Sequence, residues 1–84
     1  MKHEHELKLL TEYYNRILMG QKTFEIRRND RDFQVGDVLV LREFSGEEYL
    51  DSQPIRAEVT YITNYEQKPD YVVMGFIIQE VKDE

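Results

Sequence analysis

The sequence contains no cysteine. Disulfide bonds, and any zinc or redox site built on cysteine, are therefore excluded. Long apolar runs are also missing: none approaches the roughly 20 residues of a membrane-spanning helix, and residues 1–20 lack the apolar segment of a signal peptide. We therefore expect a soluble, cytoplasmic protein with no membrane partner.

The sequence shows no internal repeat, linker or low-complexity segment. Its 84 residues suffice for one domain, so residues 1–84 are treated as a single unit. A hydrophobic content of 40%, with six tyrosines and four phenylalanines, is enough to build a core and argues against wholesale disorder.

Positive charge is scarce in the second half of the chain. Residues 43–84 carry three basic and ten acidic side chains, whereas residues 1–42 carry eight basic and seven acidic ones. The net charge of −6 argues against indiscriminate binding to nucleic acid, which depends on neutralising phosphates. Any polyanion would have to approach the first half, where residues 20–33 contain three arginines and one lysine among three acids.

Six segments have the periodicity of regular secondary structure. A helix of about two turns is predicted from an N-cap at Thr11 to a stop at Gly20. Alternating or continuous apolar residues predict strands at 5–9, 22–28, 38–41, 55–61 and 71–81. This order indicates an α+β fold with a curled sheet of five to six strands and one or two short helices, most economically a small β-barrel.

Alternation also predicts which side chains share a face. In the second predicted strand, Phe24 and Ile26 point one way, toward the core, and Thr23, Glu25 and Arg27 point the other way. In the fourth predicted strand, residues 55, 57, 59 and 61 form the apolar face. Glycine at position 75, inside the last strand, suggests a bulge or a barrel corner, and residues 45–48 have the composition of a hairpin turn.

Two imidazoles and a carboxylate, His3, Glu4 and His5, stand together near the start of the sequence. His3 and His5 would share a face of an extended chain and could ligate a metal ion. Because no third or fourth ligand is signalled elsewhere, we predict no metal site and no cofactor.

The polar face around Glu25 supports two interpretations. Glu25 and Arg27 could form a surface ion pair worth roughly 0–1 kcal/mol, with the neighbouring basic residues simply solvated. Alternatively, the face and the loop after it form a binding site for phosphate and base edges. The predicted site residues are Lys22, Thr23, Glu25, Arg27, Arg28, Asn29 and Arg31, with Phe33, Tyr13, Tyr14 or Tyr65 as candidate stacking surfaces.

Residues Gly20–Arg27 have the form G-x-K-x-x-E-x-R, which resembles the signature of ASCH (activating signal cointegrator homology) domains of the PUA-like superfamily. Residues 28–37 and the opening His5–Lys8 are similar to a small, uncharacterised bacterial and phage branch of that group. The resemblance implies a partly open β-barrel whose cleft, lined by Lys22, Glu25 and Arg27, binds RNA or a nucleotide. Lys22 lacks the strand parity of Glu25 and Arg27, so it would precede the regular strand.

Two other functions stay open. Some ASCH-like proteins resemble enzymes acting on RNA or a modified nucleoside, including an amidohydrolase that uses the signature lysine, a threonine and a distant glutamate. Lys22 matches that lysine and is the candidate catalytic residue, but Glu25 replaces the threonine. The insertion that carries the glutamate is missing between Tyr65 and Tyr71. The remaining alternative is a protein interaction module whose acidic half docks on a basic partner.

Overall fold

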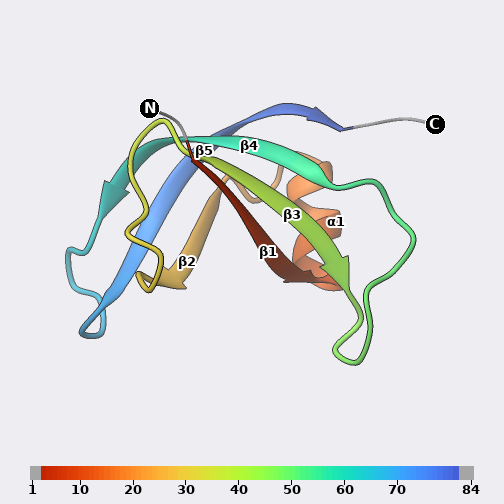
Figure 1. Cartoon of the computed structure of the whole chain (residues 1–84), viewed down its shortest axis with the longest axis horizontal. Helices are drawn as coiled ribbons and strands as arrows, with labels where there is room; N and C mark the ends of the chain where they lie inside the picture. Colours follow the sequence, from red (N-terminus) through yellow and green to blue (C-terminus); the bar gives the residue numbers. More distant parts are fainter. Residues whose placement is uncertain (1–2, 82–84) are drawn as a thin grey trace.

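The sheet of this protein is curled into a half-barrel (Figure 1). The computed structural model describes residues 3–81, which form five strands and one helix: β1 (Glu4–Leu10), α1 (Thr11–Leu18), β2 (Phe24–Arg28), β3 (Val38–Phe44), β4 (Ile55–Thr63) and β5 (Tyr71–Val81). Across the sheet the strand order is β1-β3-β4-β5-β2, with β1 and β3 parallel and the other neighbours antiparallel. The predicted α+β class and the curled sheet are confirmed.

The two ends of the sheet are β1 and β2, which are joined only through α1 in the sequence but lie at opposite ends of the strand order. The curl of the sheet turns their free edges toward each other. Side chains rather than backbone ladders span the gap, as in the hydrogen bond of 2.8 Å from Arg31 Nη1 to the Glu6 carbonyl. We call this gap between the free edges of β1 and β2 the seam.

The core fills the concave side of the half-barrel. Alternate residues of four strands point into it and are almost completely buried, together with two residues of α1 and one from the loop before β3: Leu7, Leu9, Leu39, Leu41, Ile55, Ala57, Val59, Val72, Met74, Phe76, Tyr14, Ile17 and Phe33. At about 25 cal/mol per Å² of apolar surface removed from water, this cluster is the main source of stability.

Helix α1 packs its buried residues Tyr14 and Ile17 against the sheet. It begins after Leu10, which is the N-cap and makes no side-chain capping bond, so the predicted N-cap at Thr11 is wrong. The hydroxyl of Tyr14 donates to the Gln53 carbonyl at 2.6 Å, and burial, with the nearby charge of Glu43, raises the pKa of Tyr14. No helix within residues 3–81 is long and apolar enough to cross a membrane.

The helix ends as the sequence predicts, at Gly20, whose φ of 77° favours glycine. Gly20 N–H donates to the Ile17 carbonyl at 2.9 Å, and Gln21 N–H donates to the Arg16 carbonyl at 2.8 Å. These two bonds form a Schellman motif. Because Lys22 N–H also donates to the Arg16 carbonyl, at 3.2 Å, the motif fixes the direction in which the chain leaves the helix toward β2.

The face assignment of β2 is wrong in one respect. The parity is as predicted, but Glu25 points to the inside of the half-barrel and is only 4% exposed, whereas Phe24 and Ile26 are 41% and 50% exposed. Strand β2 is an edge strand of the sheet, and among the described residues no helix or strand packs on its outer face. Glu25 can be buried beside its register partner Met74 because basic side chains pair with it.

Strand β4 departs from strict alternation near its end. Its register with β5 shifts between Val59 and Tyr61, so Tyr61 is 65% exposed rather than part of the apolar face. Val59 lies opposite Phe76 and Tyr61 lies opposite Gly75, so the extra residue of this bulge is on β4. A bulge is therefore present next to Gly75, but it is on β4 and not in the last strand, where it was predicted. The burial of Tyr61 predicted from alternation is wrong.

Asp37 ties the loop before β3 to the start of β1. The carboxylate is 1% exposed and accepts three hydrogen bonds, from His5 Nε2 at 2.8 Å, Gln34 N–H at 3.0 Å and His3 N–H at 3.3 Å. The Asp37 carbonyl also accepts from Val59 N–H at 2.8 Å, which adds β4 to the junction. His5 in turn lies edge-on to Phe33, with ring centroids 4.8 Å apart.

The pKa of Asp37 reflects two opposing effects. Burial alone would raise it, but the hydrogen bonds from His5 and from the backbone of Gln34 and His3 outweigh burial and hold the pKa below its ordinary value. A carboxyl group with a lowered pKa in the folded state stabilises the fold above the ordinary value of 3.8, and this contribution is lost as pH falls through the lowered pKa.

We expect Asp37→Ala to lower the free energy of unfolding at pH 7 by about 2–4 kcal/mol, because it leaves buried donors without an acceptor. Urea denaturation followed by circular dichroism measures this. The variant should also lose less stability than the parent protein as pH falls below 4. The exposed Asp30 in the same loop is the control, and a loss no larger in Asp37→Ala than in Asp30→Ala would contradict this role.

Candidate functional site

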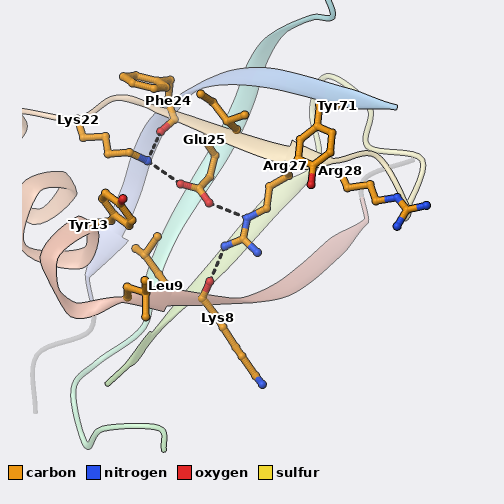
Figure 2. Close-up of a pocket in the computed structure, with 11 residues that line it drawn as sticks. Lys8, Leu9, Tyr13, Lys22, Phe24, Glu25, Arg27, Arg28 and Tyr71 are labelled. Carbon is orange, nitrogen blue, oxygen red and sulfur yellow. Dashed lines mark hydrogen bonds and ion pairs between the residues drawn. The ribbon is translucent and has the colours of Figure 1, made fainter. Parts of the chain in front are cut away.

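A groove opens along the seam between β1 with α1 on one side and β2 on the other (Figure 2). Its volume is about 620 Å³, within the range of small-ligand pockets. Apolar, aromatic and basic residues line it, and we use the name "groove" for the space lined by Lys8, Leu9, Leu10, Tyr13, Lys22, Phe24, Glu25, Ile26, Arg27, Arg28 and Tyr71.

Glu25 organises the polar part of the groove. Its Oε1 accepts from Lys22 Nζ at 2.7 Å, and its Oε2 accepts from Arg27 Nε at 2.7 Å. Lys22 Nζ also donates to the Phe24 carbonyl at 2.7 Å. The predicted pairing of Glu25 with Arg27 is therefore present, and Lys22 lies before the regular strand, as predicted. Both Lys22 contacts use the ammonium group as a donor, which is not the arrangement of a general base.

Arg27 continues this chain of contacts across the seam. Its Nη2 donates to the carbonyl of Lys8 on β1, as the dashed lines in Figure 2 show. Arg31 makes the second bridge, to the carbonyl of Glu6. These carbonyls lie two residues apart on β1, so they face the same edge of the strand. The two arginines thus satisfy backbone acceptors that no neighbouring strand pairs with.

Aromatic rings lie around the basic end of the groove. The Lys22 ammonium is 5.3 Å from the ring centre of Tyr13 and 5.0 Å from that of Phe24, both within cation–π range. Tyr13 and Phe24 are each about two-fifths exposed, so a ligand can still reach their faces. Tyr71 lies at the other end of the groove, opposite Arg28 in the β2/β5 ladder.

Four of the seven predicted site residues, Lys22, Glu25, Arg27 and Arg28, come together in the groove. The other three, Thr23, Asn29 and Arg31, lie outside its lining.

Each of these three has a different role. Thr23 is exposed, and its carbonyl accepts from Phe76 N–H. Asn29 Oδ1 accepts from Phe33 N–H at 2.8 Å and so shapes the loop after β2. Arg31 bridges the seam. No pattern in the sequence separates these three residues from the four that line the groove.

Of the aromatic residues predicted to stack, only Tyr13 lines the groove. Phe33 and Tyr14 are 3% and 5% exposed and belong to the core, and Tyr65 is exposed but lies outside the groove.

Sequence reasoning missed the other six lining residues, which are Lys8, Leu9, Leu10, Phe24, Ile26 and Tyr71. Phe24 could have been found by recognising β2 as an edge strand. Lys8 could not, since its place depends on β1 lying across the seam.

Within residues 3–81, no three side chains of His, Cys, Asp or Glu are grouped so that they could hold a metal ion. His5, one of the candidate ligands near the start of the sequence, instead contacts the Asp37 carboxylate.

The charge of the groove is opposite to that of the chain. Four basic side chains and one carboxylate line it, in a protein with a net charge of −6. Lys22 and Arg27 share the charge of Glu25, and the Lys8 ammonium lies 4.6 Å from the ring centre of Phe44, outside the groove. The exposed Arg28 is therefore the groove cation that is left to attract an anion. Basic groups beside accessible aromatic rings suit a ligand that is both anionic and aromatic.

We expect Glu25→Ala to lower the free energy of unfolding by about 1–3 kcal/mol, because it leaves two partly buried cations without their shared partner. Urea denaturation measures the change, and Glu48→Ala, at an exposed turn position, is the matched control. If Glu25→Ala is as stable as Glu48→Ala, the contacts of Glu25 contribute nothing to the free energy of unfolding, which contradicts this role.

Comparison with known proteins shows that the groove lies in a region that this chain shares with a protein family. A family model described as "Domain of unknown function (DUF3850)" matches residues 4–76, a range that includes every residue of the groove. The chain is also 32% identical over 78 residues to the "Uncharacterized 12.9 kDa protein in GpA 3'region" of Escherichia phage P2. That alignment covers 92% of this chain and 71% of the phage protein. The chain therefore belongs to the DUF3850 family.

Proposed function

We propose that the DUF3850 family is a branch of the ASCH group and that the groove of this protein binds a short single-stranded RNA segment or a nucleotide. The observation that carries the proposal is the excess of basic side chains beside exposed aromatic rings in the groove of an acidic protein. The G-x-K-x-x-E-x-R pattern adds support, since its lysine, glutamate and arginine all line the groove.

The geometry favours a single strand or a free nucleotide over a duplex. Bases in a duplex are stacked on each other and cannot reach the rings of Tyr13 and Phe24, whereas unpaired bases can. The many acidic residues of the second half would also repel a long polyanion. A short unpaired segment can place one base and one or two phosphates in the groove without meeting those acids.

Glu25 gives the site selectivity as well as structure. Its carboxylate can accept a hydrogen bond from the exocyclic amine of a base, which a site made only of cations could not do. Because Lys22 and Arg27 hold Glu25 from both sides, a ligand phosphate that draws Lys22 away would leave Oε1 available to the base.

Binding of a fluorescein-labelled RNA hexamer, measured by fluorescence anisotropy, tests the proposal. We expect binding at low salt, with the logarithm of the association constant falling by about 0.7–1.4 per tenfold rise in salt, because one or two phosphates are neutralised and each contributes about 0.7 for single strands. The absence of binding at low salt, or binding that does not respond to salt, would overturn the proposal.

The aromatic contribution has its own test. We expect Tyr13→Ala to weaken binding of the same hexamer by about 1–3 kcal/mol, or roughly 5- to 150-fold, because one stacking surface is lost. Tyr65→Ala removes an exposed ring outside the groove and should bind like the parent protein. Equal affinities of the two variants would show that Tyr13 does not contact the ligand.

A further inference from the structure

A second, smaller recess lies next to the groove. It has a volume of about 310 Å³ and is formed mainly by the loop between β4 and β5, residues 64–70. Tyr71 lines both the recess and the groove, so the two cavities share one aromatic wall. Asn29, a predicted site residue that the groove does not use, also lines the recess.

The chemistry of the recess differs from that of the groove. Three carboxamides, Asn29, Asn64 and Gln67, line it, and each offers a donor and an acceptor group. Its charged residues, Lys68 and Asp70, are of opposite sign, so it lacks the excess of positive charge found in the groove. Paired donors and acceptors without net charge suit the edge of a base better than a phosphate.

The two cavities meet at a fixed junction. Arg28 and Tyr71 are register partners in the β2/β5 ladder, and Asn29 N–H donates to the Asp70 carbonyl at 2.7 Å. Figure 2 draws Tyr71 and Arg28 at the opposite end of the groove from Lys22. Arg28 is exposed and lines the groove, and its register partner Tyr71 lines both cavities, so Arg28 lies at the end of the groove nearest the recess.

We propose that the recess is a second nucleotide subsite, so that the protein binds a single strand of at least two nucleotides and reads a base at its edge. One base lies in the groove beside Tyr13, and another enters the recess and contacts the carboxamides. Tyr71 separates the two, and Arg28 contacts the connecting phosphate. The inference rests on the proposed function and adds to it a minimum ligand length and a place where base identity is recognised.

The span of the site supports a ligand longer than one nucleotide. Phe24 and Arg28 mark the two ends of β2, which at about 3.3 Å per residue lie roughly 13 Å apart. The recess lies beyond Arg28, on the far side of Tyr71. A mononucleotide in the groove beside Tyr13 therefore leaves the recess empty.

Isothermal titration calorimetry with adenosine monophosphate and with the trinucleotide pApApA tests whether the groove and the recess bind separate nucleotides. We expect the trinucleotide to bind the parent protein more tightly than the mononucleotide does. The double variant Asn64→Ala, Gln67→Ala should lose about 5- to 150-fold in affinity for pApApA, the range for a lost base-edge contact, with its affinity for the mononucleotide unchanged. Gln79→Ala, an exposed carboxamide at the other end of β5, should change neither affinity.

The outcomes separate the two proposals. If the double variant keeps the full affinity for pApApA while Tyr13→Ala weakens both ligands, the groove binds nucleotides and the recess is not a subsite. The same conclusion follows if pApApA binds no more tightly than the mononucleotide. If the double variant weakens the mononucleotide too, the assignment of separate positions is wrong. If neither ligand nor the RNA hexamer binds the parent protein, the proposed function itself fails.

The variants are chosen to leave the fold intact. The Asn64 side chain makes no hydrogen bond within residues 3–81, and the Gln67 side chain donates only to the carbonyl of Tyr65, at 3.3 Å. Asn29 is left unchanged because its side chain accepts a hydrogen bond from the Phe33 N–H. Amide spectra that match the parent protein confirm folding, and the single variant Asn64→Ala replaces the double one if they do not.

Discussion

The bridge that Arg27 makes across the seam is the contact on which the rest of the site depends. A curled sheet of five strands over residues 3–81 leaves β1 and β2 as unpaired edges facing each other. An open edge with unpaired N–H and C=O groups invites pairing with other chains. Arg27 reaches the Lys8 carbonyl while Glu25 holds its Nε, so the edges stay at a fixed separation without a ladder between them. The groove exists because the seam is bridged by side chains and not closed by backbone.

This arrangement gives Lys22, Glu25 and Arg27 a structural role, to which the proposed function adds a binding role. The interpretation of Glu25 and Arg27 as an ordinary surface ion pair underestimates them, because Glu25 is buried and its partners anchor two strands. An interpretation in which all the basic residues are available to a ligand overestimates the number of free cations, because Arg27 and Arg31 already donate to backbone carbonyls. The groups left for a ligand are the rings of Tyr13 and Phe24 at one end of the groove and the exposed Arg28 at the other end.

The sequence predicted those parts of the fold that depend on local chemistry. Gly20 ends the helix because its left-handed conformation favours glycine, and the parity of β2 placed Glu25 and Arg27 on one face. What failed depends on neighbours distant in the sequence. Whether the face of Phe24 or that of Glu25 is buried follows from the position of β2 at the end of the sheet, and the exposure of Tyr61 follows from a register shift against β5. Lys8 joins the groove only because the sheet curls.

The central claim is that the bridged seam is where this protein meets a nucleotide ligand. Amide chemical shifts of the nitrogen-15-labelled protein, recorded while a short single-stranded RNA is added, test it most directly. The account predicts shifts concentrated at the end of α1, along β2 and on the β1 edge around Lys8. Shifts confined to the acidic second half away from Tyr71, or no shifts at ligand concentrations in the millimolar range, would contradict it.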